Sequence, residues 1–146
     1  MTLRWAVVAT GGMARAMVED FHLIPDAELK VIVSRTQTRA DEAAREWNIP
    51  EGSSDYDSVL KRTDIDAVYI ATPHVFHFEQ SKRALEAGKH VLVEKPITMN
   101  ASEARELQKI AKRSGKFLME AMWMVFSPAI IEALRIAQSG DLGKVT

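Results

Sequence analysis

The sequence predicts a doubly wound α/β fold, in which helices cover both faces of a parallel sheet. Short apolar runs alternate along the chain with segments whose apolar residues recur at helical spacing. The runs are apolar throughout, as expected for strands buried on both faces. A Gly-Gly turn joins the first run to the first helical segment, which is how the phosphate-binding half of a dinucleotide fold begins.

The first strand is expected over residues 5–8, a run too short for a helix and rich in β-formers. The dinucleotide fingerprint G-x-G-x-x-G/A aligns with residues 9–14, where Ala9 stands at the first glycine and is expected to turn with a negative φ. Gly11 lets a pyrophosphate approach the backbone, and the helix start supplies free N–H groups. A turn of this kind can also serve only to connect a strand to a helix. After the turn, Met13, Ala16, Met17 and Phe21 recur at helical spacing, which predicts the first helix.

The following elements keep the alternation. A second strand is expected over residues 29–34, and a helix with inward-facing alanines over 38–47. The polar stretch 48–55 predicts a loop with at most a very short edge strand. Asp55 is expected to cap a short helix over 56–62.

The second half of the chain repeats the same units. Further strands are expected over residues 67–71, 90–93 and 117–120. Further helices are expected over 76–87, from the capping box at Asn100 to Gly115, and over 128–139. Right-handed crossovers then give the Rossmann fold, with strand order 3-2-1-4-5-6.

Composition narrows the class of protein. The 146 residues suit one domain, and 47% hydrophobic residues are enough for a packed core. A net charge of -1 argues against a general nucleic-acid-binding surface, so no nucleic-acid partner is expected. The absence of cysteine excludes disulfides and thiolate metal sites. The four histidines show no metal-ligand spacing, so no metal is expected. We see no signal peptide and no run of about 20 apolar residues, so a cytoplasmic protein without a membrane partner is expected.

Polar and conformationally special residues follow the predicted strands. Because parallel strands all end at one edge of the sheet, these residues are expected to gather at the carboxyl edge, where such folds bind ligands. The alternative is that loops are polar in any case. The residues concerned are Thr10, Gly11 and Gly12, then Ser34 and Arg35, then Thr72, Pro73, His74 and His77, then Glu94, Lys95 and Pro96, and finally Glu120.

The end of the second strand bears on the choice of cofactor. NAD-binding folds usually place an acid there for the ribose 2′-hydroxyl, whereas this chain has Ser34 and Arg35, with Arg39 one helical turn later. Arginine can bind a 2′-phosphate bidentately, so NADP is the expected cofactor, and NAD stays possible. Alternatively, Arg35 is a solvated loop residue.

Lys95 is the expected catalytic residue. It follows a strand predicted to lie at the centre of the carboxyl edge, and the next proline restricts its backbone. A lysine held there could donate a hydrogen bond to a substrate oxygen and stabilise charge that develops on it. The alternative is a surface lysine paired with Glu94.

These motifs resemble the glucose–fructose oxidoreductase and inositol dehydrogenase (Gfo/Idh/MocA) family. The resemblance covers essentially the whole chain, and Glu94-Lys95-Pro96 matches the family's E-K-P signature. It includes Ala71-Thr-Pro-His74 with His77, and Met119-Glu-Ala-Met-Trp123. The last motif is most similar to the subgroup that contains dimeric dihydrodiol dehydrogenase and NADP-dependent D-xylose dehydrogenase.

The resemblance implies reversible hydride transfer between NADP and a hydroxyl or carbonyl group of a sugar, polyol or diol. It implies that Lys95 takes part in catalysis beside the nicotinamide. The cofactor contacts expected from the turn, the strand ends and the resemblance are Ala9, Thr10, Gly11, Gly12, Met13, Ala14, Ser34, Arg35, Arg39, Thr72, Pro73, His74, His77, Glu94, Lys95, Glu120 and Trp123. The second hypothesis is a catalytically silent dinucleotide-binding or redox-sensing module.

The chain departs from the family in length. Members continue into a second α/β domain with an open sheet, which holds further substrate contacts and the dimer interface. We therefore expect residues 1–125 to be the cofactor domain and 126–146 a connecting helix at the start of the missing domain, with this chain alone inactive. Val125 replaces the arginine usual in the subgroup. The apolar run 122–126 is expected to be an interface, with homo-oligomers forming through the absent domain, or else it folds into this domain's core.

Overall fold

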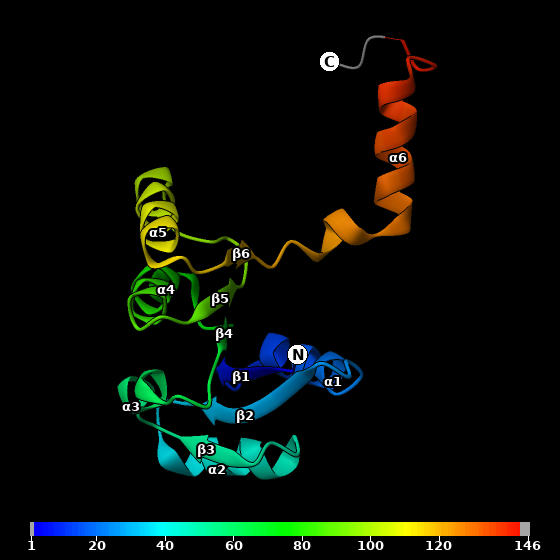
Figure 1. Cartoon of the computed structure of the whole chain (residues 1–146). Coiled ribbons are helices and arrows are strands. Elements are labelled where there is room, and N and C mark those ends of the chain that lie inside the picture. Colours follow the sequence, from blue (N-terminus) through cyan, green and yellow to red (C-terminus); the bar gives the residue numbers. More distant parts are fainter. Residues whose placement is uncertain (1, 144–146) are drawn as a thin grey trace.

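The computed structural model describes residues 2–143, and within them six strands form one sheet in the order β3-β2-β1-β4-β5-β6 (Figure 1). Every neighbouring pair is parallel, so the predicted Rossmann order is confirmed. The strands are β1 (Leu3–Val8), β2 (Ala27–Val33), β3 (Glu51–Ser53), β4 (Ala67–Ile70), β5 (His90–Val93) and β6 (Leu118–Glu120).

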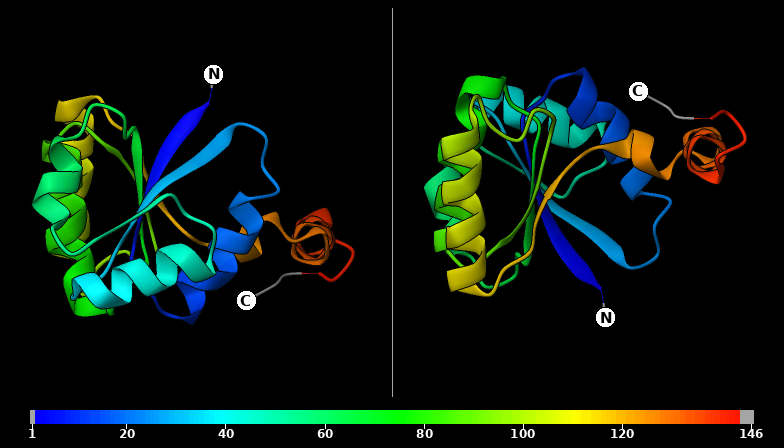
Figure 2. Two further views of the ribbon diagram at one scale, coloured as in Figure 1. Left: turned by 90° about the horizontal axis from the view of Figure 1, so that it is seen from below. Right: turned by 90° about the horizontal axis from the view of Figure 1, so that it is seen from above.

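Helices cover both faces of this sheet (Figure 2). One buried cluster joins α1 and α2 to the sheet, and another joins α3, α4 and α5 to the opposite face. Two short 3-10 helices, His74–Phe76 and Trp123–Phe126, follow β4 and β6. The α-helices are α1 (Gly12–Phe21), α2 (Gln37–Glu46), α3 (Tyr56–Lys61), α4 (His77–Glu86), α5 (Ala101–Ser114) and α6 (Pro128–Ser139).

The inward face of α1 is narrower than the apolar spacing alone indicates. The buried residues are Ala14, Val18 and Phe21, which lie at spacings of four and three along the helix. Met13, which is 50% exposed, and Ala16, which is also exposed, recur at helical spacing without belonging to that face. The apolar residues of this helix form two stripes, and only one of them packs on the sheet.

The corner between α2 and β3 depends on a close backbone approach. A Cβ added to Gly52 would lie 2.4 Å from the backbone carbon of Ala40, so only glycine lets the edge strand reach this helix. Gln37 completes the corner, because its amide group donates to the Gly52 carbonyl oxygen at 2.8 Å and accepts from the Ser54 amide at 3.0 Å. The start of α2 is thereby fixed against the edge strand β3.

Helix α6 does not pack on the sheet. It matches its predicted bounds, yet none of its residues is buried, and it stands away from the sheet and the helices that cover the sheet (Figure 1). The proposed domain boundary after residue 125 stays a prediction, although residues 126–143 contribute nothing to either buried cluster.

Candidate cofactor and catalytic site

The turn after β1 brings a free helix start to the carboxyl edge. Within residues 2–143, no side chain caps the N-terminus of α1, so its first N–H groups lack a side-chain acceptor. A Cβ on Gly11 or Gly12 would have nothing within 4 Å, which shows open space above the turn. An uncapped helix start facing open space is suited to an anion such as a pyrophosphate.

Ala9 makes this turn in a way that corrects the prediction. Its φ is 130°, so the expected negative φ was wrong. The Ala9 amide donates to the Val33 carbonyl oxygen at 3.0 Å, which continues the pairing with β2 while the chain turns away from it. Glycine favours such a φ, so Ala9 holds a strained backbone at the start of the fingerprint.

The end of β2 lies beside this turn. The hydroxyl oxygens of Thr10 and Ser34 are 3.4 Å apart, so two neighbouring strand ends meet. Arg35 and Arg39 are exposed, and within residues 2–143 neither forms an ion pair. Both guanidinium groups are therefore available to an anionic ligand near the end of β2.

The end of β4 is organised around a buried histidine. The His77 ring is 0% exposed, and its two nitrogens lie 2.8 Å from the carbonyl oxygens of Thr72 and Pro96. Carbonyl oxygens only accept, so the tautomer of the ring decides which of these two oxygens receives its hydrogen bond. The Thr72 hydroxyl donates to the side-chain oxygen of Gln80 at 2.6 Å. Pro73 and His74 are exposed above this group.

The loop after β5 presents Lys95. The side chain of Lys95 is exposed, and within residues 2–143 it forms no ion pair, so the alternative of a pair with Glu94 is not what the structure has. Glu94 is buried and accepts from the Lys95 backbone amide at 3.3 Å. The hydroxyl of Tyr69 donates to the other oxygen of this carboxylate at 2.8 Å. Burial, followed by the bond to Glu94, raises the pKa of Tyr69, so its hydroxyl stays a donor.

Two more side chains hold the rest of this loop. His77 bonds to the Pro96 carbonyl oxygen, and the Glu120 carboxylate accepts from the Ile97 amide at 2.8 Å. Glu94, His77 and Glu120 therefore come together as predicted, and the structure shows each of them bonded to the backbone around Lys95. Whether they also contact a cofactor stays a prediction. The fully buried His77 ring presents no accessible surface for such a contact.

Tyr69 and Gln37 are the residues that the sequence interpretation missed. A tyrosine inside an otherwise apolar buried strand needs a partner for its hydroxyl, which was the available signal for Tyr69. The partner itself comes from a different strand, and the sequence does not indicate which one.

A mostly apolar cavity of about 310 Å³ adjoins this loop. Glu94 reaches it from the loop after β5, Met13 and Met17 from α1, and Trp123 and Phe126 from the segment after β6. The cavity thus lies between α1 and the loop that carries Lys95.

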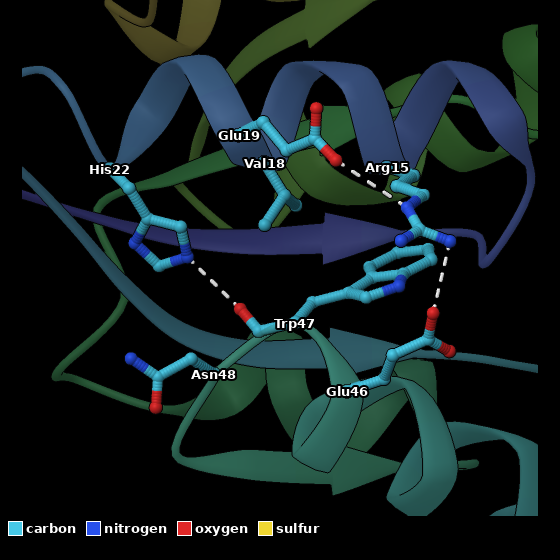
Figure 3. Close-up of a pocket in the computed structure, with 7 residues that line it drawn as sticks. All are labelled: Arg15, Val18, Glu19, His22, Glu46, Trp47 and Asn48. Carbon is cyan, nitrogen blue, oxygen red and sulfur yellow. Dashed lines mark hydrogen bonds and ion pairs between the residues drawn. The ribbon is translucent and has the colours of Figure 1, made fainter.

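A second cavity, of about 250 Å³, lies between α1 and the end of α2 (Figure 3). Its charged groups bond to one another or to the chain. Arg15 pairs with Glu19 and Glu46, and His22 contacts the Trp47 carbonyl oxygen. It therefore offers less to a ligand than the carboxyl edge does.

Among residues 2–143, no cluster of histidine and acidic side chains could hold a metal ion. In the same range, no helix is both long and apolar enough to cross a lipid bilayer.

The fold and the carboxyl edge define a dinucleotide-binding domain of the Rossmann class. Comparison of the sequence with family profiles gives a match over residues 3–122 to the Gfo/Idh/MocA oxidoreductases, described as an oxidoreductase family with an NAD-binding Rossmann fold. The chain belongs to this family.

Known relatives extend well beyond the length of this chain. It is 39% identical to mouse trans-1,2-dihydrobenzene-1,2-diol dehydrogenase, a match that covers 98% of this chain and 44% of that protein. It is 33% identical to the NADP(+) D-xylose 1-dehydrogenase of Hypocrea jecorina, over 99% of this chain and 40% of the relative. The structure of KijD10, a 3-ketoreductase from Actinomadura kijaniata in complex with NADP, superposes with a TM-score of 0.91 at 32% identity, covering 98% and 46% of the two chains. The chain thus spans less than half the length of these relatives.

Proposed function

We propose that this chain is the cofactor-binding half of an NADP(H)-dependent oxidoreductase that acts on a hydroxyl or carbonyl group. The observation that carries the proposal is the exposed, unpaired Lys95 on a loop whose backbone is held by buried side chains, beside the cavity that α1 also borders. A flexible lysine on a fixed backbone at this edge is suited to meet a substrate oxygen.

The residues present fit a dinucleotide. The uncapped start of α1 and the open space at Gly11 and Gly12 would receive the pyrophosphate, lined by Ala9, Thr10, Met13 and Ala14. Ser34, Arg35 and Arg39 would hold the 2′-phosphate, because a guanidinium attracts it where an acid would repel it. The remaining proposed contacts are Thr72, Pro73, His74, Glu94, Glu120 and Trp123, whereas the fully buried His77 serves this loop through its backbone.

When bound, NADP would supply or accept the hydride. The chain's own contribution lies in Lys95, whose ammonium would donate a hydrogen bond to the substrate oxygen and release or return a proton there as charge develops. The carboxylate of Glu94 and the ring of His77 act on the backbone of this loop, which fixes the point from which the Lys95 side chain extends.

The relatives support a substrate class and an assembly for the whole protein. The names of the mouse and Hypocrea relatives refer to a diol and a sugar. We therefore propose a sugar, polyol or diol substrate, bound between this domain and a second α/β domain, and a homo-oligomer formed through that domain. The cytoplasmic location expected from the sequence stays a prediction.

Cofactor titration tests the proposal on this chain directly. We expect NADPH to bind more tightly than NADH by calorimetry, and Arg35→Asp to weaken NADPH binding by about 1.5–3 kcal/mol, because a charge-assisted contact is lost and a repulsion is gained. Arg45→Asp is the matched control, since it makes the same charge change on an exposed residue at the far end of α2. Equal or tighter binding of NADH would show that the 2′-phosphate argument is wrong.

A further inference from the structure

The carboxylate of Glu94 is held between two donors. The hydroxyl of Tyr69, from β4, donates to one oxygen at 2.8 Å, and the amide of Lys95 lies 3.3 Å from the other. Tyr69 is 0% exposed and Glu94 is 6% exposed, so both groups are largely removed from solvent. We infer that Tyr69 is a positioning residue for Lys95 that acts through Glu94, an inference that rests on the proposed function.

The chemistry of the group explains why a hydroxyl is needed there. An ionised carboxylate only accepts hydrogen bonds, and leaving it buried with too few donors is unfavourable. Within residues 2–143, its side-chain donor is Tyr69, and it forms no ion pair. Without that hydroxyl, the carboxylate would regain hydrogen-bond donors by turning toward the cavity that it borders, where water can reach it. The Lys95 amide would then lose its acceptor.

The arrangement makes Tyr69 distinct from a residue that only fills space. Its ring packs in the cluster between the sheet and α1, with an edge contact to Phe21 at 6.3 Å between ring centroids. Phenylalanine would preserve this packing and remove only the bond to Glu94. The substitution Tyr69→Phe therefore separates positioning from packing.

The chain offers a matched control. Its only other tyrosine is Tyr56, whose hydroxyl donates to the Gln80 carbonyl oxygen at 3.0 Å, away from Glu94. Tyr56→Phe removes the same kind of group from a partly buried bond. We expect Tyr69→Phe, and not Tyr56→Phe, to speed hydrogen exchange at the Lys95 amide of this chain, as followed by NMR.

Kinetics of the full-length protein that contains this chain give the second readout. We expect Tyr69→Phe to lower kcat by about 10- to 100-fold, the scale of a small misplacement of a catalytic group, with KM for NADPH within about twofold of the parent. Adding Tyr69→Phe to Glu94→Gln is expected to cause no further loss of kcat, because the effect travels through the same carboxylate.

Each outcome decides the inference. Unchanged Lys95 amide exchange in Tyr69→Phe overturns it, as does a full additional loss of kcat on top of Glu94→Gln. The proposed function fails separately, if Lys95→Met retains the parental kcat. When Lys95→Met lowers kcat and Tyr69→Phe does not, only the positioning role of Tyr69 is overturned.

Discussion

The segments that follow two neighbouring strands, β5 and β6, differ in polarity and in how their backbones are held. In the loop after β5, residues 94–97, the Glu94 carboxylate accepts a hydrogen bond from Tyr69. The side chains of His77 and Glu120 form hydrogen bonds with the backbone of the same loop. The segment after β6, residues 122–126, is apolar, and its side chains are 41% to 67% exposed. Both segments lie at the same edge of the sheet and border the same cavity.

The difference separates two uses of one sheet edge. In the first segment, buried or partly buried polar groups fix the backbone, and Lys95 forms no ion pair within the part of the chain that the structure describes, which suits chemistry at a defined point. In the second, large apolar side chains are left uncovered, which is typical of an interface or ligand surface. The alternative that this second segment folds back into the core of its own domain is not what the structure shows. The predicted interface itself remains a prediction.

The largest expected effect comes from the one free side chain of the fixed loop. In the full-length protein, we expect Lys95→Met to lower kcat by about 100- to 1,000-fold, because a donor to the reacting oxygen is lost, while NADPH affinity changes little. Steady-state kinetics and calorimetry measure the two quantities. Lys109→Met, an exposed lysine on α5, is the control. If kcat of Lys95→Met equals that of the parent, as expected for the control, Lys95 has a structural role and not a catalytic one.

A smaller effect, on stability, tests whether the fixed loop depends on its buried anchors. We expect His77→Phe to lower the free energy of unfolding by about 2–5 kcal/mol, because the carbonyl oxygens of Thr72 and Pro96 both lose a buried partner. Urea denaturation measures this. His22→Phe serves for comparison, since His22 is exposed and, among residues 2–143, its ring has one hydrogen bond, to the Trp47 carbonyl oxygen. Equal losses in the two variants would contradict the anchoring role.

Local chemistry made most of the fold predictable. The bounds of β5 and α6 match the expected residues, and Asp55 caps α3 by accepting from the Ser58 amide as expected. Strand order followed from uninterrupted apolar runs and from the handedness of crossovers. These features depend on neighbours in sequence or on rules that hold for every parallel sheet.

The errors arose where the outcome depends on distant partners. Ala9 combines its positive φ with a hydrogen bond to Val33 on the neighbouring strand, and the roles of Glu94 and Glu120 depend on groups 23 or 25 residues away. The sequence predicted that the site residues gather at the carboxyl edge of the sheet. It did not indicate which of them face a ligand and which hold the backbone of a loop. On α1, two apolar stripes competed, and only packing decided between them.

The smallest expected change in stability belongs to the segment after β6. Trp123 is 67% exposed, whereas Trp5 and Trp47 are partly buried. We expect this chain to self-associate through residues 122–126 in sedimentation experiments, and Trp123→Ser with Phe126→Ser to favour the monomer. The free energy of unfolding of the monomer should stay within about 0.5 kcal/mol, because neither side chain is packed in the core. Acrylamide should quench Trp123 in the monomer and less at high concentration. A parent chain that stays monomeric with all three tryptophans shielded would show that the segment is covered by its own domain, and the contrast between the two strand ends would then lose its basis.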